Sequence, residues 1–275
     1  MIAKLAAVLG FIHRFHRKHP RLFETVKFLI FSTIIIIAVD AGMNGLSYKW
    51  QWYRIPQYIL EKTSEGMTAG PLLQGLKITL AISAVSLLLS FLIGFLTALM
   101  RLSDSVTAVW ISRIYLELIR NTPLLIQLFL MYFVIAPILG MGRNISAVLA
   151  LSLFEGAYTS EIIRSGIIAI EKGQWEAAYS IGLSNSLSYR LIILPQAFRH
   201  VLPMLAGQAI SLIKDSALVS TIAIYDLTMR GQVAISETFL TFEIWFTVAA
   251  VYLIINICLS VLIRMLEKRM KKVEI

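Results

Sequence analysis

One long, mostly apolar stretch at residues 72–100 limits what this chain can fold into. A helix rises about 1.5 Å per residue, so this stretch is more than long enough to cross a hydrocarbon core about 30 Å thick. Of the 275 residues, 58% are hydrophobic, whereas soluble domains average about 45–50%. We therefore expect an all-α integral membrane protein.

Further apolar segments bring the predicted number of transmembrane helices to six. They lie at about residues 28–43, 106–135 (broken at Pro123), 145–163, 203–224 and 244–263. The alternative for residues 28–43 is a cleaved signal peptide, but its basic region would be unusually long and no small-x-small cleavage site follows. We therefore expect a retained extra N-terminal span, within a first part at residues 1–70 that also holds a basic arm and an outer segment. Residues 71–275 form the second part.

Basic residues are spread unevenly between the loops, and this predicts the orientation. With both termini inside, segments 1–27, 101–113, 164–200 and 264–275 hold 17 Lys and Arg, and the outer segments 44–70, 137–145 and 222–243 hold 5. Basic loops favour the cytoplasmic side, so we expect a multi-pass protein with both termini and residues 164–200 in the cytoplasm. The overall surplus of positive charge then suits a membrane surface, and we expect no nucleic-acid partner.

Three histidines at helical spacing, His13, His16 and His19, lie in the basic arm. Metal binding is one interpretation, but no Cys or carboxylate completes a site. We expect instead that the arm lies against anionic lipid headgroups.

The longest polar interval after the first spans predicts two short helices joined by a sharp turn at residues 173–195. Gly182 can supply the left-handed residue that ends the first helix, and Ser184 is a plausible N-cap for the second. Ala177 and Ala178 give the first helix a flat side, which suits docking into another protein's groove. An ordinary intracellular loop is the alternative interpretation.

This interval resembles the EAA loop in the membrane subunits of ABC importers. The residues of that motif are present at the family's spacing: Glu176, Ala177, Ala178, Gly182, Ile192, Leu194 and Pro195. Residues 117–127, 156–167, 173–174 and 212–220 resemble further signatures of the polar amino acid branch of that family, which includes permeases of the histidine, glutamine and glutamate type. The resemblance covers about residues 71–265.

The resemblance implies a five-helix permease core, here with one extra N-terminal span, and a coupling loop at about residues 166–200 that contains a short cytoplasmic helix. It implies a bacterial inner-membrane location, a second permease subunit of the same or a homologous sequence, two ATP-binding cassette subunits and an extracytoplasmic amino-acid-binding protein. The substrate would be a polar amino acid. The residues that the resemblance assigns to ATPase coupling are Gly173, Gln174, Trp175, Glu176, Ala177, Ala178 and Gly182.

No catalytic motif is present in the sequence. Without a Gly-Lys dipeptide the chain cannot build a P-loop, and neither His-Glu-x-x-His nor Gly-x-Ser-x-Gly occurs. We therefore expect a non-catalytic subunit that binds no cofactor, with ATP and Mg on the partner ATPase.

Polar residues within the apolar segments are candidates for the substrate path, because a charged group at membrane depth costs about 2.5–3.5 kcal/mol. Glu155 has no obvious basic partner nearby, so we expect it to line the path or to make a polar contact between helices. Salt bridges to neighbouring helices are the alternative for Lys214 and Asp215. The full set of candidates is Gln127, Glu155, Tyr158, Thr159, Lys214, Asp215 and Ser216.

Two further pairs, Glu117 with Arg120 and Glu161 with Arg164, are spaced i, i+3 and are predicted to neutralise each other. Glu155 and Asp215 also suggest an alternative function, an ion-coupled secondary amino acid carrier, but the sequence shows no clear internal repeat of the kind found in many carriers. A third alternative is a membrane-embedded enzyme, but the sequence contains no recognisable set of catalytic residues. We therefore expect the permease subunit of an ATP-driven importer, whose amino acid and pairing, homodimeric or heterodimeric, the sequence leaves open.

Overall fold

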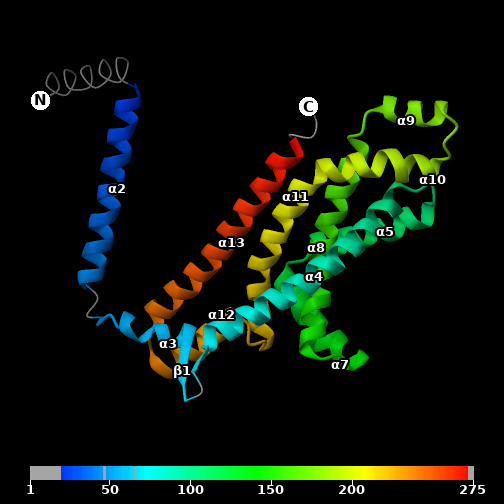
Figure 1. The fold of residues 1–275 in the computed structure, drawn as a ribbon. Helices are drawn as coiled ribbons and strands as arrows, with labels where there is room; N and C mark the ends of the chain where they lie inside the picture. The colour runs from blue at the N-terminus through cyan, green and yellow to red at the C-terminus, as the bar shows by residue number, and fades with distance from the viewer. Residues whose placement is uncertain (1–19, 46–47, 65, 272–275) are drawn as a thin grey trace, which may run out of the picture. The chain divides into compact units, whose positions relative to one another are not determined.

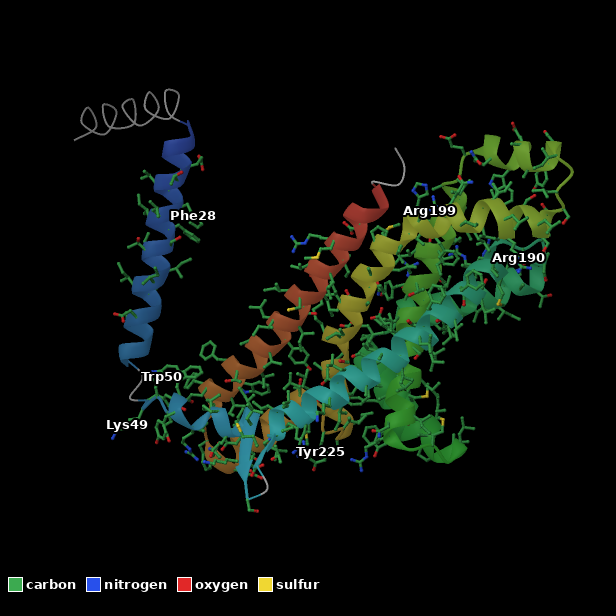
Figure 2. All side chains as sticks on the ribbon, viewed as in Figure 1. Phe28, Lys49, Trp50, Arg190, Arg199 and Tyr225 are labelled. Atoms are coloured by element: carbon green, nitrogen blue, oxygen red, sulfur yellow. The ribbon has the colours of Figure 1, made fainter. Side chains whose placement is uncertain are left out.

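The computed structural model describes residues 20–45, 48–64 and 66–271, and the histidines of the basic arm lie outside this range. The chain divides into two compact units, Met1–Trp50 and Gln51–Ile275. The first contains one described helix, α2 (Pro20–Gly45). Near its start Lys27 pairs with Glu24 at 2.9 Å, and its apolar side chains, such as Phe28 (Figure 2), are exposed.

The second unit is helical apart from one hairpin (Figure 1). It begins with the 3-10 helix η1 (Trp52–Arg54), α3 (Pro56–Ile59) and the antiparallel strands β1 (Leu60–Thr63) and β2 (Gly66–Ala69), in which Leu60 lies opposite Ala69. The helices that follow are α4 (Pro71–Leu102), α5 (Val106–Arg120), α6 (Leu124–Phe129), the π-helical η2 (Leu130–Ile135), α7 (Ala136–Leu139), α8 (Arg143–Ile168), α9 (Lys172–Ser180), α10 (Asn185–Ser188), the π-helical η3 (Tyr189–Ile193), α11 (Leu194–Asp215), the 3-10 helix η4 (Ser216–Ile222), α12 (Leu227–Thr238) and α13 (Thr241–Lys271).

By length and composition, three stretches of these helices could cross a membrane: Glu24–Gly42, Pro71–Leu102 and Thr241–Met265. The pair Val106–Arg120 and Leu124–Leu139, bent by 106°, would add a fourth if it forms one span. Helices α8 and α11 stand where two further spans were predicted, but they carry buried or half-buried polar residues such as Ser152, Glu155 and Gln208. The helical membrane fold is thus confirmed, while the count of six spans stays a prediction.

Helix α4 packs along α8 through small residues, which let two backbones approach closely. A Cβ at Gly94 would lie 2.6 Å from Thr159 Cγ2, and one at Gly156 would lie 2.9 Å from Ile93 Cγ2. The hydroxyl of Ser152 donates to the Ser86 carbonyl at 3.3 Å across the same contact. This contact therefore depends on the absence of side chains at the two glycines.

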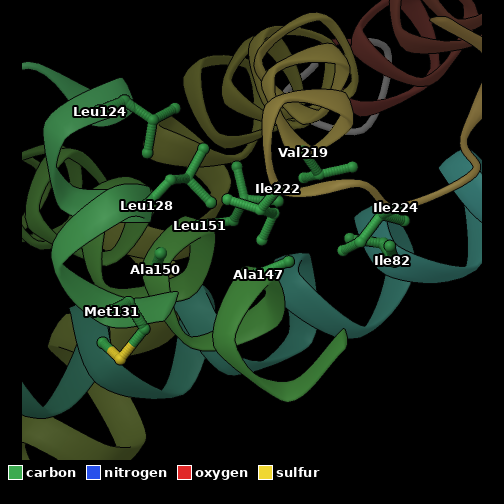
Figure 3. Packing of buried hydrophobic residues seen from close by; sticks show 10 residues of the cluster. All are labelled: Ile82, Leu124, Leu128, Met131, Ala147, Ala150, Leu151, Val219, Ile222 and Ile224. Atoms are coloured by element: carbon green, nitrogen blue, oxygen red, sulfur yellow. The ribbon is translucent and has the colours of Figure 1, made fainter. Parts of the chain in front are cut away.

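Hydrophobic residues from α4, α6, η2, α8 and η4 meet in one core cluster (Figure 3). Its buried members are Ile82, Leu124, Leu128, Met131, Ala147, Ala150, Leu151, Val219, Ile222 and Ile224. The cluster joins segments far apart in the sequence and fixes the broken α5–α6 region against α8. A second cluster holds the N-terminal segment of this unit to α4, α12 and α13 through Ile55, Leu72, Leu227, Leu240 and Ile244.

The elements extend beyond the predicted spans. The fifth span was predicted to follow Pro203, and α11, the helix that contains this proline, begins earlier, at Leu194, with Pro195 as its second residue. Since η3 precedes α11 without a gap, Pro195 lies inside a continuous helical stretch, where a proline lacks the N–H that would donate to the preceding turn. The hairpin and α12 lie in two of the three predicted outer segments, 44–70 and 222–243, where no element was foreseen. Within the second unit, α9 and the C-terminal end of α13 lie toward one end, and the hairpin and α7 toward the other (Figure 1).

Candidate functional site

The loop between α8 and α11 contains the predicted first short helix, α9, and the sharp turn after it, whereas the predicted second short helix, α10, is the start of a helical stretch that continues into α11. At its turn Gly182 has a φ of +80°. The Gly182 N–H donates to the Tyr179 carbonyl at 2.9 Å, and the Leu183 N–H donates to the Ala178 carbonyl at 3.1 Å. These two bonds form a Schellman motif, in which glycine is favoured because a side chain resists positive φ.

The second helix starts with the predicted cap: the Ser184 side chain accepts from the Leu187 N–H at 3.4 Å. The turn is tied further by the Tyr179 hydroxyl, which donates to Asn185 Oδ1 at 2.6 Å. Helix α10 then continues through η3 into α11 without a gap. The loop is therefore a defined structure continuous with a long helix of the core.

Helix α9 is attached to the core by one face. Trp175 packs edge-on against Tyr189 of η3, with ring centroids 4.8 Å apart, and Ala178 is fully buried. Gln196 on α11 donates to Gln174 Oε1 at 3.1 Å. Beneath these contacts lies a third core cluster that includes Ala98, Ile163, Ile167, Ile193 and Ala197. A displacement of α9 would therefore be transmitted to α11.

The opposite face of α9 is open. Gly173, Glu176 and Ala177 are exposed, and a Cβ at Gly173 would meet nothing within 4 Å. Large apolar side chains are exposed on the segments that follow, namely Ile181, Leu187 and Leu191. Of the seven residues assigned to coupling, four lie on the open face or at the turn (Gly173, Glu176, Ala177 and Gly182) and three on the attached side (Gln174, Trp175 and Ala178).

The second part of the candidate site centres on Glu155 of α8, which is fully buried. Its carboxylate accepts a hydrogen bond from the side-chain nitrogen of Gln208 on α11, and Asp215, half-buried, interacts with it electrostatically. The sequence reasoning missed Gln208. It lies seven residues before Asp215, so both occupy the same helix face, but this spacing does not identify Glu155 of α8 as its partner.

The other candidates for the substrate path do not gather around Glu155 as a group. Thr159 packs against Gly94 of α4, and the Ser216 hydroxyl, fully buried, donates to the Ile213 carbonyl of its own helix. Lys214 is exposed. Tyr158, three residues after Glu155, lies beneath Arg120 of α5, whose guanidinium carbon is 5.7 Å from the ring centroid.

Gln127 supports the break between α5 and α6. Its side-chain nitrogen donates to the Ile119 carbonyl at 2.7 Å and to the Thr122 carbonyl at 2.9 Å. These carbonyls lie at the C-terminal end of α5, where a helix leaves acceptors without helical partners. Pro123 follows as the residue directly before α6, which runs in a different direction from α5.

The two predicted ion pairs behave differently. Glu161 pairs with Arg164 and also with Arg101 at the end of α4, a partner that sequence reasoning missed. The predicted pairing of Glu117 with Arg120 was wrong. Glu117 Oε2 instead accepts from Asn121 Nδ2 at 2.7 Å, and Arg120 stacks over Tyr158, so within the described residues the two charges have different partners.

Comparison with known proteins gives consistent matches. The glutamine transport system permease protein GlnP of Escherichia coli (strain K12) is 38% identical over 203 residues, which cover 73% of this chain and 93% of that protein. The arginine transport system permease protein ArtQ of Bacillus subtilis (strain 168) is 35% identical over 202 residues, which cover 73% of this chain and 92% of that protein.

One solved structure is described as an amino acid ABC transporter with histidines. Its match covers 81% of this chain and 100% of the chain in that structure, with a TM-score of 0.72 and 32% sequence identity. A chain of the methionine ABC transporter MetNI in an inward-facing conformation matches with a TM-score of 0.62, and the match covers 72% of this chain and 95% of that one. Its sequence identity of 19% supports a shared fold alone. The family model for the binding-protein-dependent transport system inner membrane component matches residues 90–272. With most of its length matched in this way, the chain belongs to the family of binding-protein-dependent transport system inner membrane components.

Proposed function

We propose that this chain is the permease subunit of an ATP-driven ABC importer for polar amino acids. The observation that carries the proposal is the similarity to permeases named for glutamine and arginine transport over about three quarters of the chain. An L-cystine transport system permease of Bacillus subtilis, 35% identical over 205 residues, extends the same class. An ion-coupled secondary carrier is not favoured, because the relatives are components of ABC systems.

Helix α9 is the proposed coupling helix, seated in a cleft of a cytoplasmic ATPase. Its open face with Glu176 and Ala177 and the exposed Ile181 support this assignment. Arg190 on η3 and Arg199 on α11 (Figure 2) place positive charge near this loop, which suits the cytoplasmic side of a bilayer. The proposal includes six spans, with both termini and α9 in the cytoplasm.

The proposed assembly contains a second permease subunit, two ATP-binding cassette subunits and an extracytoplasmic binding protein that delivers the amino acid. The chain itself is non-catalytic and binds no cofactor, and ATP and Mg are held by the ATPase. Closure of the ATPase dimer would move α9, and the contacts of Trp175 with Tyr189 and of Gln174 with Gln196 would carry this movement into α11. Since α11 also carries Gln208, the movement would reach the buried Glu155.

The experiment is purification of the tagged chain, identification of co-purifying proteins by mass spectrometry, and uptake by proteoliposomes that contain the assembly. Uptake of a polar amino acid that depends on ATP and on an ATPase subunit would support the proposal. Uptake by the chain alone, driven by a proton or sodium gradient, would refute it. Loss of that uptake on Glu155→Gln or Asp215→Asn would then indicate the ion-coupled carrier.

A further inference from the structure

A polar cavity of about 330 Å³ lies beside the break between α5 and α6, apart from the Glu155 contact. Its lining consists of Leu116, Glu117, Arg120, Asn121 and Tyr158. Ligand pockets usually start at about 300 Å³, so the space suits a small metabolite. The lining presents a carboxylate, a guanidinium, an amide and a phenol, which is an unusual set of groups for an apolar protein.

The chain is broken at this cavity near the middle of a candidate span. Helix α5 ends at Arg120, the backbone is non-helical through Pro123, and the following segment turns by 106°. Broken helices at membrane depth are tolerated where they line a polar space, and their C-terminal ends attract cationic groups. The Gln127 hydrogen bonds to the Ile119 and Thr122 carbonyls hold this break in place.

The two charges in the cavity do not neutralise each other. In the described part of the chain Glu117 and Arg120 form no ion pair with each other. The Asn121 amide holds the Glu117 carboxylate at 2.7 Å, and the Tyr158 ring holds the Arg120 guanidinium. Both charged residues are exposed on this chain. Charges at membrane depth face an assembly interior or a water-filled path rather than lipid.

From this geometry we infer that the cavity binds the main-chain groups of the transported amino acid, with Glu117 accepting from its α-ammonium and Arg120 donating to its α-carboxylate. The inference rests on the proposed function and names the part of the substrate that this chain recognises. Every α-amino acid carries these two groups, so the cavity recognises α-amino acids as a class. The side chain of the substrate is recognised at another site. Asn121 and Gln127 are positioning residues, because they hold the carboxylate and the helix break.

The test measures binding of radiolabelled L-glutamine, L-arginine and L-cystine, up to millimolar concentration, to the intact permease–ATPase complex in nanodiscs. The binding protein is omitted, because it would impose its own selectivity. Arg120→Gln and Glu117→Gln should each weaken binding by about tenfold or more, since each removes a charge-assisted hydrogen bond. The matched control is Arg113→Gln, an exposed arginine on α5 outside the cavity, which should stay within about twofold.

A second measurement uses the wild-type complex and does not depend on the variants' assembly. If L-glutamine binds, the competitors are 4-aminobutanamide, which lacks the carboxylate, and glutaramic acid, which lacks the ammonium; for L-arginine the competitor is agmatine. Each should bind about tenfold or more weakly than the amino acid. Competitors as effective as the amino acid, or Arg120→Gln and Glu117→Gln complexes that bind like wild type, would overturn the inference.

Failure of the inferred binding site can be distinguished from failure of the proposed transport function. A wild-type complex that takes up an amino acid in proteoliposomes but binds none in nanodiscs would overturn the inference and leave the proposed function standing. A complex that takes up no amino acid under ATP would refute the proposed function itself.

Discussion

The side-chain nitrogen of Gln208 on α11 donates a hydrogen bond to Glu155 on α8, and this carboxylate is fully buried. The contact joins the helix attached to α9 with the helix that packs along α4. A buried carboxylate that loses its donor bears a desolvation cost that the hydrogen bond otherwise offsets. The contact therefore couples the stability of the bundle to the position of α11.

Replacing Gln208 by Leu should destabilise the assembly by about 1–3 kcal/mol, the cost of an unsatisfied buried polar group. Thermal unfolding of the purified complex would measure this, and Gln208→Glu should be at least as harmful because it places a second carboxyl beside Glu155. The control is Gln232→Leu, at an exposed glutamine on α12. An unchanged melting temperature for Gln208→Leu would show that the bond contributes nothing to stability.

The contact of Gly94 with Thr159 gives a second prediction. A Cβ at position 94 would lie 2.6 Å from Thr159 Cγ2 and 2.7 Å from its Cβ, so Gly94→Ala should destabilise the complex by about 1–3 kcal/mol through overpacking. Thr159→Gly removes both atoms, so the double variant should recover part of the lost stability, less the roughly 1 kcal/mol that a glycine costs inside a helix. Gly142→Ala, where a Cβ meets nothing within 4 Å, is the control.

The double variant also separates two roles for Thr159, which the sequence placed in the substrate path. If Thr159 only packs against α4, the restored complex should take up amino acid at the wild-type rate. Restored stability with lost uptake would instead support a role of its hydroxyl in transport.

Gly182 gives a third prediction, because its φ of +80° disfavours a β-branched side chain. Gly182→Val should distort the α9–α10 turn at a cost of about 1–3 kcal/mol. ATPase co-purification should fall while the amount of membrane-inserted permease stays normal. Gly142→Val, at a φ of −80°, is the control, and normal ATPase yield with Gly182→Val would contradict the prediction.

The sequence predicted those features that depend on neighbouring residues. The left-handed Gly182, the Ser184 cap and the interruption at Pro123 each follow from local backbone chemistry, and each is present. The long apolar stretch of α4 likewise predicts a helix from its own composition.

The features that sequence reasoning missed depend on contacts between distant segments. Gln208 meets Glu155 across 53 residues, and Arg101 meets Glu161 across 60, so no local spacing identifies them as pairs. The expected pairing of Glu117 with Arg120 was wrong for the same reason. Tyr158, which comes from another helix, provides the surface on which the arginine stacks. Helical spacing makes such a pair possible, and packing decides whether it forms.

The contact of Trp175 with Tyr189 gives the last prediction, which separates docking from transmission. The two rings meet edge-on at 4.8 Å, and such pairs contribute about 0.5–1.5 kcal/mol beyond their buried area. Trp175 is half-buried on the attached side of α9, whereas Glu176 beside it is exposed. Trp175→Ala should therefore leave the ATPase bound but loosen α9 from α11.

In proteoliposomes, the amount of amino acid taken up per ATP hydrolysed by the Trp175→Ala complex should fall by roughly two- to tenfold. ATPase yield should stay near normal, unlike that of Gly182→Val. Trp110→Ala, at an exposed tryptophan on α5, is the matched control and should keep the wild-type ratio. Loss of the ATPase from the Trp175→Ala complex would assign Trp175 to docking. An unchanged ratio of uptake to hydrolysis would show that α9 drives α11 through other contacts, of which the Gln174–Gln196 hydrogen bond is the next to test.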